Sequence, residues 1–407
     1  MGIAYDLFGD GKTAIKASLG RYGGGVFTGY SALFQPSAAA VTSTTRAWTD
    51  TNGNFFPDCS LRNPLANGEC QAMTNQSFGG VQVRTRPDPD WIKGWGKAPY
   101  NWQASVSIDR EVLPGVAVNA GYFRTWFGNQ TVTDNLNVTP ADFDPYCITV
   151  PTDSRLPGNI SGQRLCGFYD LKPEKFGQID NIVTLASKYG KWKEYYNGVD
   201  FGINARLPRG ARIGGGWNIG NSISLPPGLT FISSKQSRCF IVDSPQDLTY
   251  PLSIHSAAPG FANGCETANT YESRFKLNGS YPLPWNLQAA AVFQDLPGTY
   301  YSAFATYTTA QIAPSLGRNL AGGTRTMTVD LLPLYNHFVD QRIVQLDLRL
   351  SKILQVGKAR VQGNLDVFNA LNSSALLSVN QTYGASWLQP TQIMPGRMLK
   401  VGVQMDF

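Results

Sequence analysis

The last eleven residues, 397–407 (RMLKVGVQMDF), constrain the fold more than any other stretch because two kinds of side chain alternate along them. Every second residue from Leu399 to Phe407 is apolar, and the residues between them are mostly polar. A period of two places alternate side chains on opposite faces of a β-strand. The apolar positions are Leu399, Val401, Val403, Met405 and Phe407.

The rest of the chain repeats this pattern in segments that are joined by two kinds of connection. Short turns rich in Gly or Pro are typical of hairpins, and they fall at 8–12, 110–115, 208–210, 281–285 and 355–357. Long connections alternate with them and cover 23–97, 126–191, 223–269, 297–341 and 371–396. Outer-membrane barrels have this asymmetry, with short periplasmic turns and long extracellular loops.

We therefore predict an all-β fold, an antiparallel transmembrane β-barrel segment of about eleven strands. In the expected strand at 98–109, for example, Val106 and Ile108 alternate with Ser105 and Ser107. The alternative is a soluble sandwich, in which long structureless connections are uncommon. Aromatic residues near strand ends fit an interfacial girdle: Trp102, Tyr122, Trp217, Tyr281 and Trp285. The expected strands are 2–7, 13–22, 98–109, 115–126, 192–206, 211–222, 270–281, 286–296, 342–354, 358–370 and 397–407.

Composition narrows the function classes. The chain of 407 residues is 15% charged with a net charge of +6, and it has no basic block that would suit nucleic acid. It lacks a run of about 18 apolar residues, so no transmembrane helix is expected. The first residues (MGIAYD) do not form a signal peptide. Because a barrel must be exported, we expect residue 1 not to be the true N-terminus.

All six cysteines fall in the long connections, two in each of the first three. Six cysteines allow fifteen pairings, but this partition favours Cys59–Cys70, Cys147–Cys166 and Cys239–Cys265. Disulfides fit an oxidising compartment. A metal site is a poor alternative, since Cys-x-x-Cys spacing is absent and the chain has only two His.

The first long connection contains a candidate calcium loop, and no other cofactor is expected from the sequence. Asp50, Asn52, Asn54 and Asp58 place side-chain oxygens at offsets 0, 2, 4 and 8, as in the first part of a calcium loop. The twelfth position is Leu61 rather than Glu. An Asx-rich turn without metal is the alternative.

Catalytic arrangements are scarce, so we do not expect an enzyme. A Ser-His-Asp site is not expected with two His and without Gly-x-Ser-x-Gly. Asp142 and Asp144 lie in a long connection, where solvated surface is expected. Aromatic residues there either stack on a ligand at an extracellular mouth or brace the loops: Trp126, Trp192, Tyr300, Tyr301 and Trp387.

Four stretches resemble the C-terminal half of TonB-dependent outer-membrane receptors, in the carboxypeptidase-regulatory-like (Oar-like) group. They are residues 2–22 (GIAYDLFGDGKTAIKASLGRY), 101–111 (NWQASVSIDRE), 367–372 (VFNALN) and the closing strand 397–407. The resemblance implies a 22-stranded barrel filled by a plug, of which residues 1–407 supply the C-terminal half of the wall. The plug and the first barrel half are expected to be absent.

The resemblance also implies TonB-coupled uptake of a large, scarce substrate, such as a siderophore, an oligosaccharide or a peptide. The expected location is the Gram-negative outer membrane, and the expected partners are membrane lipid and lipopolysaccharide, the TonB complex through the plug, the barrel-assembly machinery and an extracellular ligand. The closing strand, with Val401, Val403, Met405 and Phe407, is the expected assembly signal. The alternatives are a passive porin, an adhesin barrel and a secreted carbohydrate-binding protein.

Overall fold

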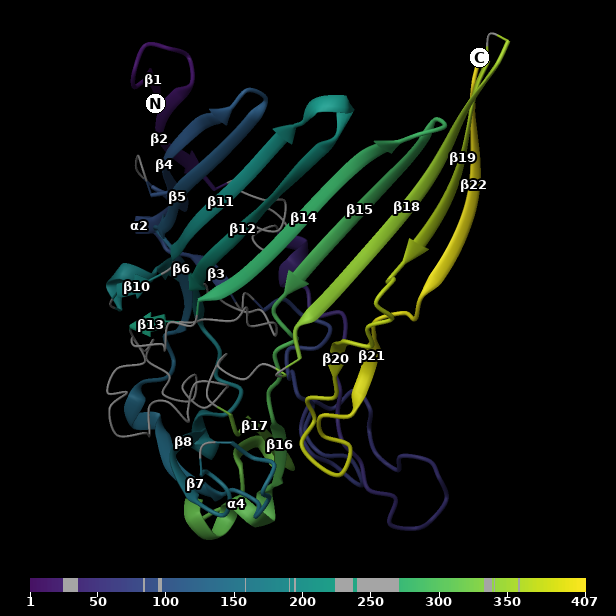
Figure 1. Ribbon diagram of the computed structural model, residues 1–407. Coiled ribbons are helices and arrows are strands. Elements are labelled where there is room, and N and C mark those ends of the chain that lie inside the picture. Colours follow the sequence, from purple (N-terminus) through teal and green to yellow (C-terminus); the bar gives the residue numbers. More distant parts are fainter. Residues whose placement is uncertain are drawn as a thin grey trace.

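Eleven strands form one antiparallel sheet in the computed structural model (Figure 1). Each strand pairs with the next one of this sheet along the chain, so the sheet is a continuous meander. The structure describes residues 1–24, 36–82, 85–93, 97–157, 159–189, 191–193, 195–223, 237–239, 271–332, 339, 341–357 and 359–407. The strands are β1 (Gly2–Asp6), β2 (Thr13–Gly23), β4 (Tyr100–Leu113), β5 (Val116–Gly128), β11 (Tyr195–Arg206), β12 (Arg212–Ile223), β14 (Glu272–Leu283), β15 (Leu287–Leu296), β18 (Ile343–Val356), β19 (Ala359–Phe368) and β22 (Met398–Asp406).

The prediction of eleven antiparallel strands is confirmed, and the hairpin turns show why the chain reverses where it does. Gly9 and Gly11 both have φ of 72°, a left-handed conformation that glycine adopts without a steric cost. At Gly115 the neighbouring chain also comes close, since an added Cβ would lie 2.6 Å from the carbonyl oxygen of Arg206. The backbone N–H of Arg206 donates to the carbonyl of Gly115 at 2.7 Å, which joins this turn to the next strand.

The strand register gathers apolar side chains on one face of the sheet. Ile108 lies opposite both Ile15 and Ala120, and Phe201 lies opposite both Ala120 and Trp217. We call this side the apolar face and the other side the polar face. Side chains of the apolar face are exposed, with values of 55% for Val106 and 45% for Phe201.

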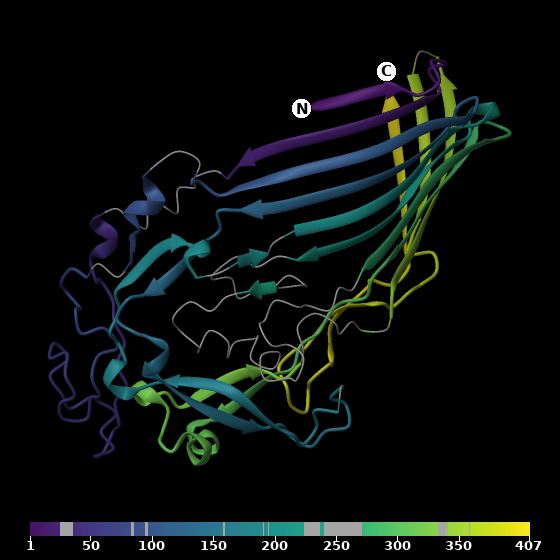
Figure 2. The same ribbon diagram turned by 90° about the vertical axis from the view of Figure 1, so that its left-hand side faces the viewer.

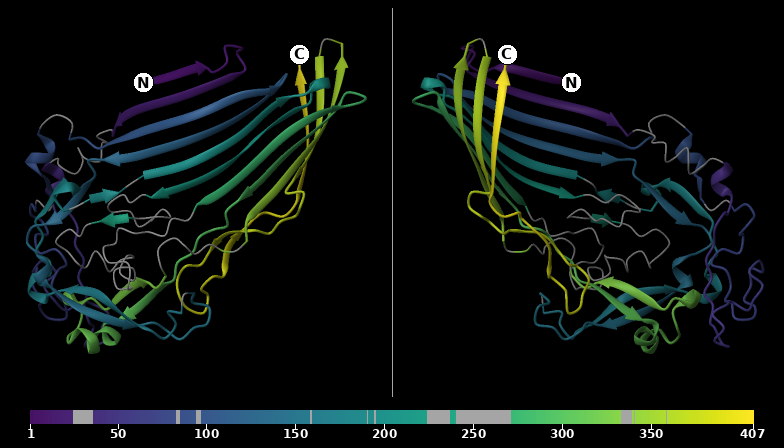
Figure 3. Two further views of the ribbon diagram at one scale, coloured as in Figure 1. Left: turned by 60° about the vertical axis from the view of Figure 1, so that its left-hand side comes forward. Right: turned by 90° about the vertical axis from the view of Figure 1, so that its right-hand side faces the viewer.

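The described parts of the long connections lie at one end of the sheet and the short turns lie at the other (Figure 1). The C-terminal Phe407 is at the turn end. Figures 2 and 3 show that the sheet curves, so that its first and last strands run in different directions, the result of accumulated strand twist. Within the described ranges, no helix is both long and apolar enough to span a bilayer.

The long connections contain further elements that the sequence pattern did not reveal. Within the described residues, their α-helices are α2 (Pro89–Ile92) and α4 (Thr309–Leu316). Their strands form small separate sheets: β3 (Thr85–Pro87), β6 (Thr131–Asn135), β7 (Phe143–Thr149), β8 (Arg164–Leu171), β9 (Asn181–Leu185), β10 (Lys191–Lys193), β13 (Ser237–Cys239), β16 (Phe304–Thr308), β17 (Thr326–Asp330), β20 (Leu376–Val379) and β21 (Pro390–Ile393). These strands are short, with little room for a readable alternation.

Candidate functional site: a cap built from the long connections

Three long connections fold together around one apolar core, which lies apart from the strands of the large sheet. We call the unit formed by β7–β8, the segment 150–160, the β16–α4–β17 region with the adjoining residues 301–303 and 331–332, and the segment 380–389 the loop cap. Because its core draws on three connections, none of them can leave the cap without exposing apolar surface. The core residues are Tyr146, Ile148, Val150, Leu156, Ile160, Phe168, Ala303, Ala305, Tyr307, Ile312, Leu320, Val329, Leu331, Leu332 and Trp387.

The β7–β8 hairpin forms one side of this core. A disulfide joins Cys147 to Cys166 across the hairpin, and the rings of Tyr146 and Phe168 stack with their centroids 5.6 Å apart. Burial raises the pKa of the Tyr146 phenol well above its usual range. The phenol of Tyr307, on β16, donates to the carbonyl of Thr149 at 3.2 Å, and burial raises its pKa to about 12. The hairpin and β16 are therefore held together by both apolar and polar contacts.

Helix α4 closes the second side of the cap. Thr308 and Gln311 form a capping box at its start, and Gly317 ends it in the left-handed conformation with φ of 79°. The following Arg318 donates to Asp144 at 2.9 Å and to the buried Asp170 at 2.5 Å. The side chain of Asp144 is 34% exposed and so is partly solvated, and an arginine 174 residues further along the chain also binds its carboxylate.

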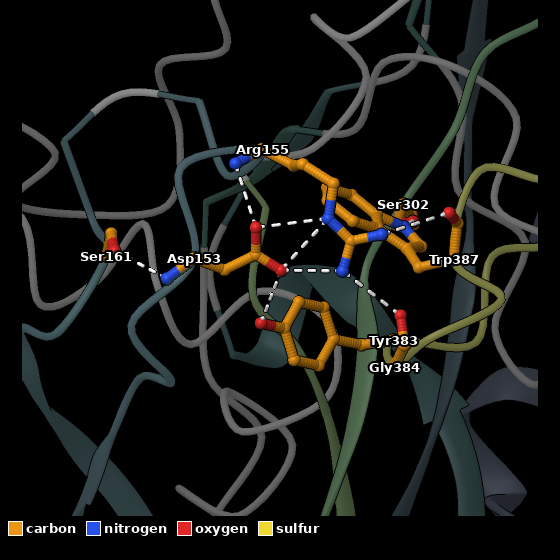
Figure 4. Close-up of polar contacts among 7 residues, drawn as sticks. All are labelled: Asp153, Arg155, Ser161, Ser302, Tyr383, Gly384 and Trp387. Atoms are coloured by element: carbon orange, nitrogen blue, oxygen red, sulfur yellow. Dashed lines mark hydrogen bonds and ion pairs between the residues drawn. The ribbon is translucent and has the colours of Figure 1, made fainter.

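Asp153 stands where the three connections meet (Figure 4). Its Oδ2 accepts from Arg155 Nη2 at 2.7 Å and from the phenol of Tyr383 at 3.0 Å. Arg155 also donates to the carbonyl of Gly384 at 3.2 Å. The indole of Trp387 donates to the carbonyl of Ser302 at 2.8 Å. The guanidinium of Arg155 is the largest influence that holds the pKa of the Asp153 carboxyl below its usual range. We call these residues the Asp153 clasp.

The aromatic residues that sequence reasoning singled out separate into three environments. Trp387 is 2% exposed, and Tyr301 packs against it with ring centroids 6.1 Å apart. The structure thus gives Trp387 the bracing role. Trp126 instead lies on β5 and stacks on Trp102 at 6.1 Å, outside the cap. Tyr300 is half-buried beside Tyr301, and the side chain of Trp192 lies outside the described residues.

In the candidate calcium loop at residues 50–58, the carboxylate oxygens accept hydrogen bonds from N–H groups of the loop itself. Asp50 accepts from the backbone N–H groups of Gly53 and Phe55 at 2.7 and 2.9 Å. Asp58 Oδ2 accepts from the side-chain amides of Asn52 and Asn54 at 2.5 and 2.8 Å. In the described part of the chain, no three His, Cys, Asp or Glu side chains come close enough to hold a metal ion. Calcium binding stays a prediction.

A disulfide between Cys59 and Cys70 fixes the base of this loop. It and Cys147–Cys166 are two of the three pairs that the sequence predicts. Cys265 lies outside the described residues, so the pairing of Cys239 with it stays a prediction. Val401, Val403 and Met405 lie on β22 with their side chains exposed on the apolar face.

The first connection also contains a cavity of about 480 Å³ that no sequence motif indicated. Its walls come from two segments, 39–45 and 74–82, and no charged side chain lines it. Hydroxyl and amide groups without charge suit a neutral polar ligand. The polar lining residues are Thr42, Ser43, Thr44, Thr45, Thr74, Asn75 and Gln82.

No protein-family model matches this chain, and no curated protein matches it. Solved structures resemble it along nearly its whole length. The outer membrane transporter YddB from Escherichia coli is 14% identical with a TM-score of 0.46, and the match covers 99% of this chain and 39% of YddB. The pyoverdine outer membrane receptor FpvA from Pseudomonas aeruginosa PAO1 is 10% identical with a TM-score of 0.40, and the match covers 100% of this chain and 35% of FpvA.

A third solved structure, a mutant of the ferric enterobactin receptor PfeA from Pseudomonas aeruginosa, is 9% identical with a TM-score of 0.42, and the match covers 99% of this chain and 39% of PfeA. The chain thus spans less than two fifths of the length of these proteins. The likenesses concern architecture alone.

Proposed function

We propose that this chain forms the C-terminal half of the barrel wall in a TonB-dependent transporter of the Gram-negative outer membrane. The observation that carries the proposal is the exposed apolar face of the eleven-stranded sheet. Leu348 on β18 is 40% exposed and Val401 on β22 is 77% exposed, although both belong to strands whose polar side chains point the other way. A contiguous apolar surface of this extent is unfavourable in water, and lipid hydrocarbon is the medium that covers it without cost.

Aromatic and arginine side chains at the loop end of the apolar face support a membrane boundary there. The guanidinium of Arg124 lies 5.9 Å from the ring of Trp126 and 5.7 Å from that of Tyr195. Arg21 lies 4.0 Å from the ring of Tyr100. Aromatic residues concentrate at membrane interfaces, and arginine binds phosphate well. These residues are our candidates for contact with the phosphates of lipopolysaccharide.

The two ends of the sheet have different roles in the proposed transport. The loop cap and the first connection are placed outside the cell, where they meet a siderophore, an oligosaccharide or a peptide. The turn end faces the periplasm, where a plug supplied by a preceding segment engages the TonB complex. The closing strand, ending in Phe407, presents the signal for the barrel-assembly machinery. Residues 1–407 then supply the wall and the loops.

Two experiments test the proposal in order. Cells that express the full-length protein are fractionated, and we expect the protein in the outer membrane, extractable only with detergent. Recovery in the soluble fraction would favour a secreted binding protein. Uptake of labelled candidate substrates is then compared in strains with and without TonB. Uptake that does not depend on TonB would favour a passive porin, and surface binding without uptake would favour an adhesin.

A further inference from the structure

Two arginines face each other directly at the turn end of the sheet. Arg206, the last residue of β11, pairs with Arg212, the first residue of β12, on the polar face. The turn between them is closed by a hydrogen bond from the Leu207 N–H to the Ala211 carbonyl at 2.8 Å. Directly opposed residues of an antiparallel pair have Cβ atoms about 4.5–5.5 Å apart, and like charges in this position are destabilising. A bound anion would therefore reduce the repulsion between these two arginines.

No carboxylate in the described ranges of the chain forms an ion pair with either arginine. Other cations on the same face do have such partners. Arg349 on β18 donates to Asp366 on β19 at 2.5 Å. Lys16 on β2 lies 3.1 Å from Asp109 on β4. These two cations have a carboxylate on the neighbouring strand, whereas Arg206 and Arg212 face each other with none among the described residues.

A cavity of about 600 Å³ opens beside this pair. Asn204 and Asn278 line it with amide groups, and Gly214 lies between them. A Cβ at Gly214 would lie 3.0 Å from Asn278 Oδ1 and 3.5 Å from Asn204 Oδ1, so the absence of a side chain there keeps the space open. The lining of this one opening thus includes two arginines and two asparagines.

Glu111 also lines the cavity, and it is the one acidic side chain among the lining residues described. Its Oε1 accepts the backbone N–H of Gly115 at 2.8 Å, which directs this oxygen to the 114–115 turn. The formal charge of the lining is +1, from two arginines and one glutamate. This net positive charge still favours the binding of an anion next to the arginines.

We propose that Arg206 and Arg212 form an anion site that binds a carboxylate or phosphate group on the polar face. Planar guanidinium groups bind both anions through paired charge-assisted hydrogen bonds, and the amides of Asn204 and Asn278 provide N–H donors at its side. In the proposed transporter this site lies inside the barrel at its periplasmic end. The anion binding itself does not depend on transport.

The test uses the full-length protein in detergent micelles, with inorganic phosphate and glutamate as separate probes at constant ionic strength. Isothermal titration should show saturable binding of at least one probe. The double variant R206Q/R212Q should weaken that binding by roughly tenfold for each arginine, the loss expected for a charge-assisted hydrogen bond. Stronger binding of phosphate or of glutamate assigns the anion class.

The matched control is R209Q, because Arg209 carries the same charge in the same turn and does not line the cavity. It should bind the probe as the parent chain does. Absence of binding by either probe, or equal losses in R209Q and R206Q/R212Q, would overturn the site and indicate only a diffuse positive field. Circular dichroism of both variants should match the parent chain. Neither result bears on whether uptake requires TonB, so the two proposals fail separately.

Discussion

The phenol of Tyr383 donates a hydrogen bond to the carboxylate of Asp153 at 3.0 Å, across 230 residues of sequence. This contact joins the second long connection to the last one, and the indole of Trp387 joins the last one to the fourth. The three loops that would face the outside of the cell are therefore braced against one another. In the proposed transporter, a ligand that passes this cap would have to open such contacts.

Replacing Tyr383 with Phe should loosen the cap without changing its apolar core. The variant loses the hydrogen bond to Asp153 but keeps the ring beside Trp387, whose centroid lies 5.5 Å away. Amide hydrogen exchange in segments 151–157 and 380–389 should become severalfold faster. Tyr189→Phe is the matched control, since Tyr189 donates to Asp134 at 2.6 Å outside the cap. Unchanged exchange in Tyr383→Phe would show that the clasp does not hold the loops.

The Asp153 clasp should also weaken in acid. Hydrogen bonding from Arg155 lowers the folded-state pKa of Asp153 below its ordinary value, which is about 3.9. A lowered pKa contributes stability that is present above the ordinary pKa and is lost as the pH falls through the folded pKa. The protection of the 151–157 amides, taken as the intrinsic exchange rate divided by the observed rate at each pH, should therefore fall below about pH 4. Asp153→Asn should remove this acid dependence, and its persistence there would assign the effect to another carboxylate.

The Cys147–Cys166 disulfide should stabilise the cap through the hairpin that it closes. Its cysteines are separated by 19 positions, and a bridge of this length is worth about 2–4 kcal/mol. Replacing both cysteines with Ser should lower the thermal midpoint for unfolding of the cap, measured by loop proteolysis against temperature. The pair Cys59 and Cys70, replaced in the same way, should leave cap proteolysis unchanged because it lies in the first connection. Equal effects of both double variants would contradict a local role.

The strands of the sheet were predictable because they need only a local pattern. Each hairpin, such as β18–β19, contains alternating apolar and polar residues over about ten positions. Gly or Pro then marks the turn between its two strands. Two disulfides were predictable for a related reason, since each pair falls within one connection. Both features depend on residues that are close in sequence.

The loop cap was not predictable from local pattern. Arg318 donates to Asp144 and Asp170, which lie 174 and 148 residues earlier in the chain. The residues around Arg318 in the sequence do not indicate these partners. Asp153 and Arg155 were missed as well. Their short spacing looks like an ordinary charged loop, and only the folded chain brings Tyr383 to them. Contacts between distant loops are set by packing, which a single sequence does not display.

The calcium and Asx-turn interpretations of residues 50–58 predict opposite outcomes in a titration. We expect the Asx turn, because the amides of Asn52 and Asn54 already donate to Asp58. Calcium should then produce no binding heat and no change in proteolysis of the first connection. Saturable heat that disappears in Asp58→Asn would establish the calcium site instead. Lys97→Gln is a control outside the loop.

The membrane placement of the apolar face makes the sharpest prediction at two neighbouring residues of β4. Val106 points to the apolar face and is 55% exposed, whereas Ser107 points to the polar face opposite Lys16 and Gly121. An arginine on the lipid-facing side near the bilayer midplane costs about 2–4 kcal/mol, so Val106→Arg should lower the outer-membrane yield of the full-length protein and its resistance to urea in lipid vesicles. Ser107→Arg adds the same charge one residue away and should change both quantities much less. If the two variants behaved alike, or if Ser107→Arg were the more damaging, lipid would not cover this face.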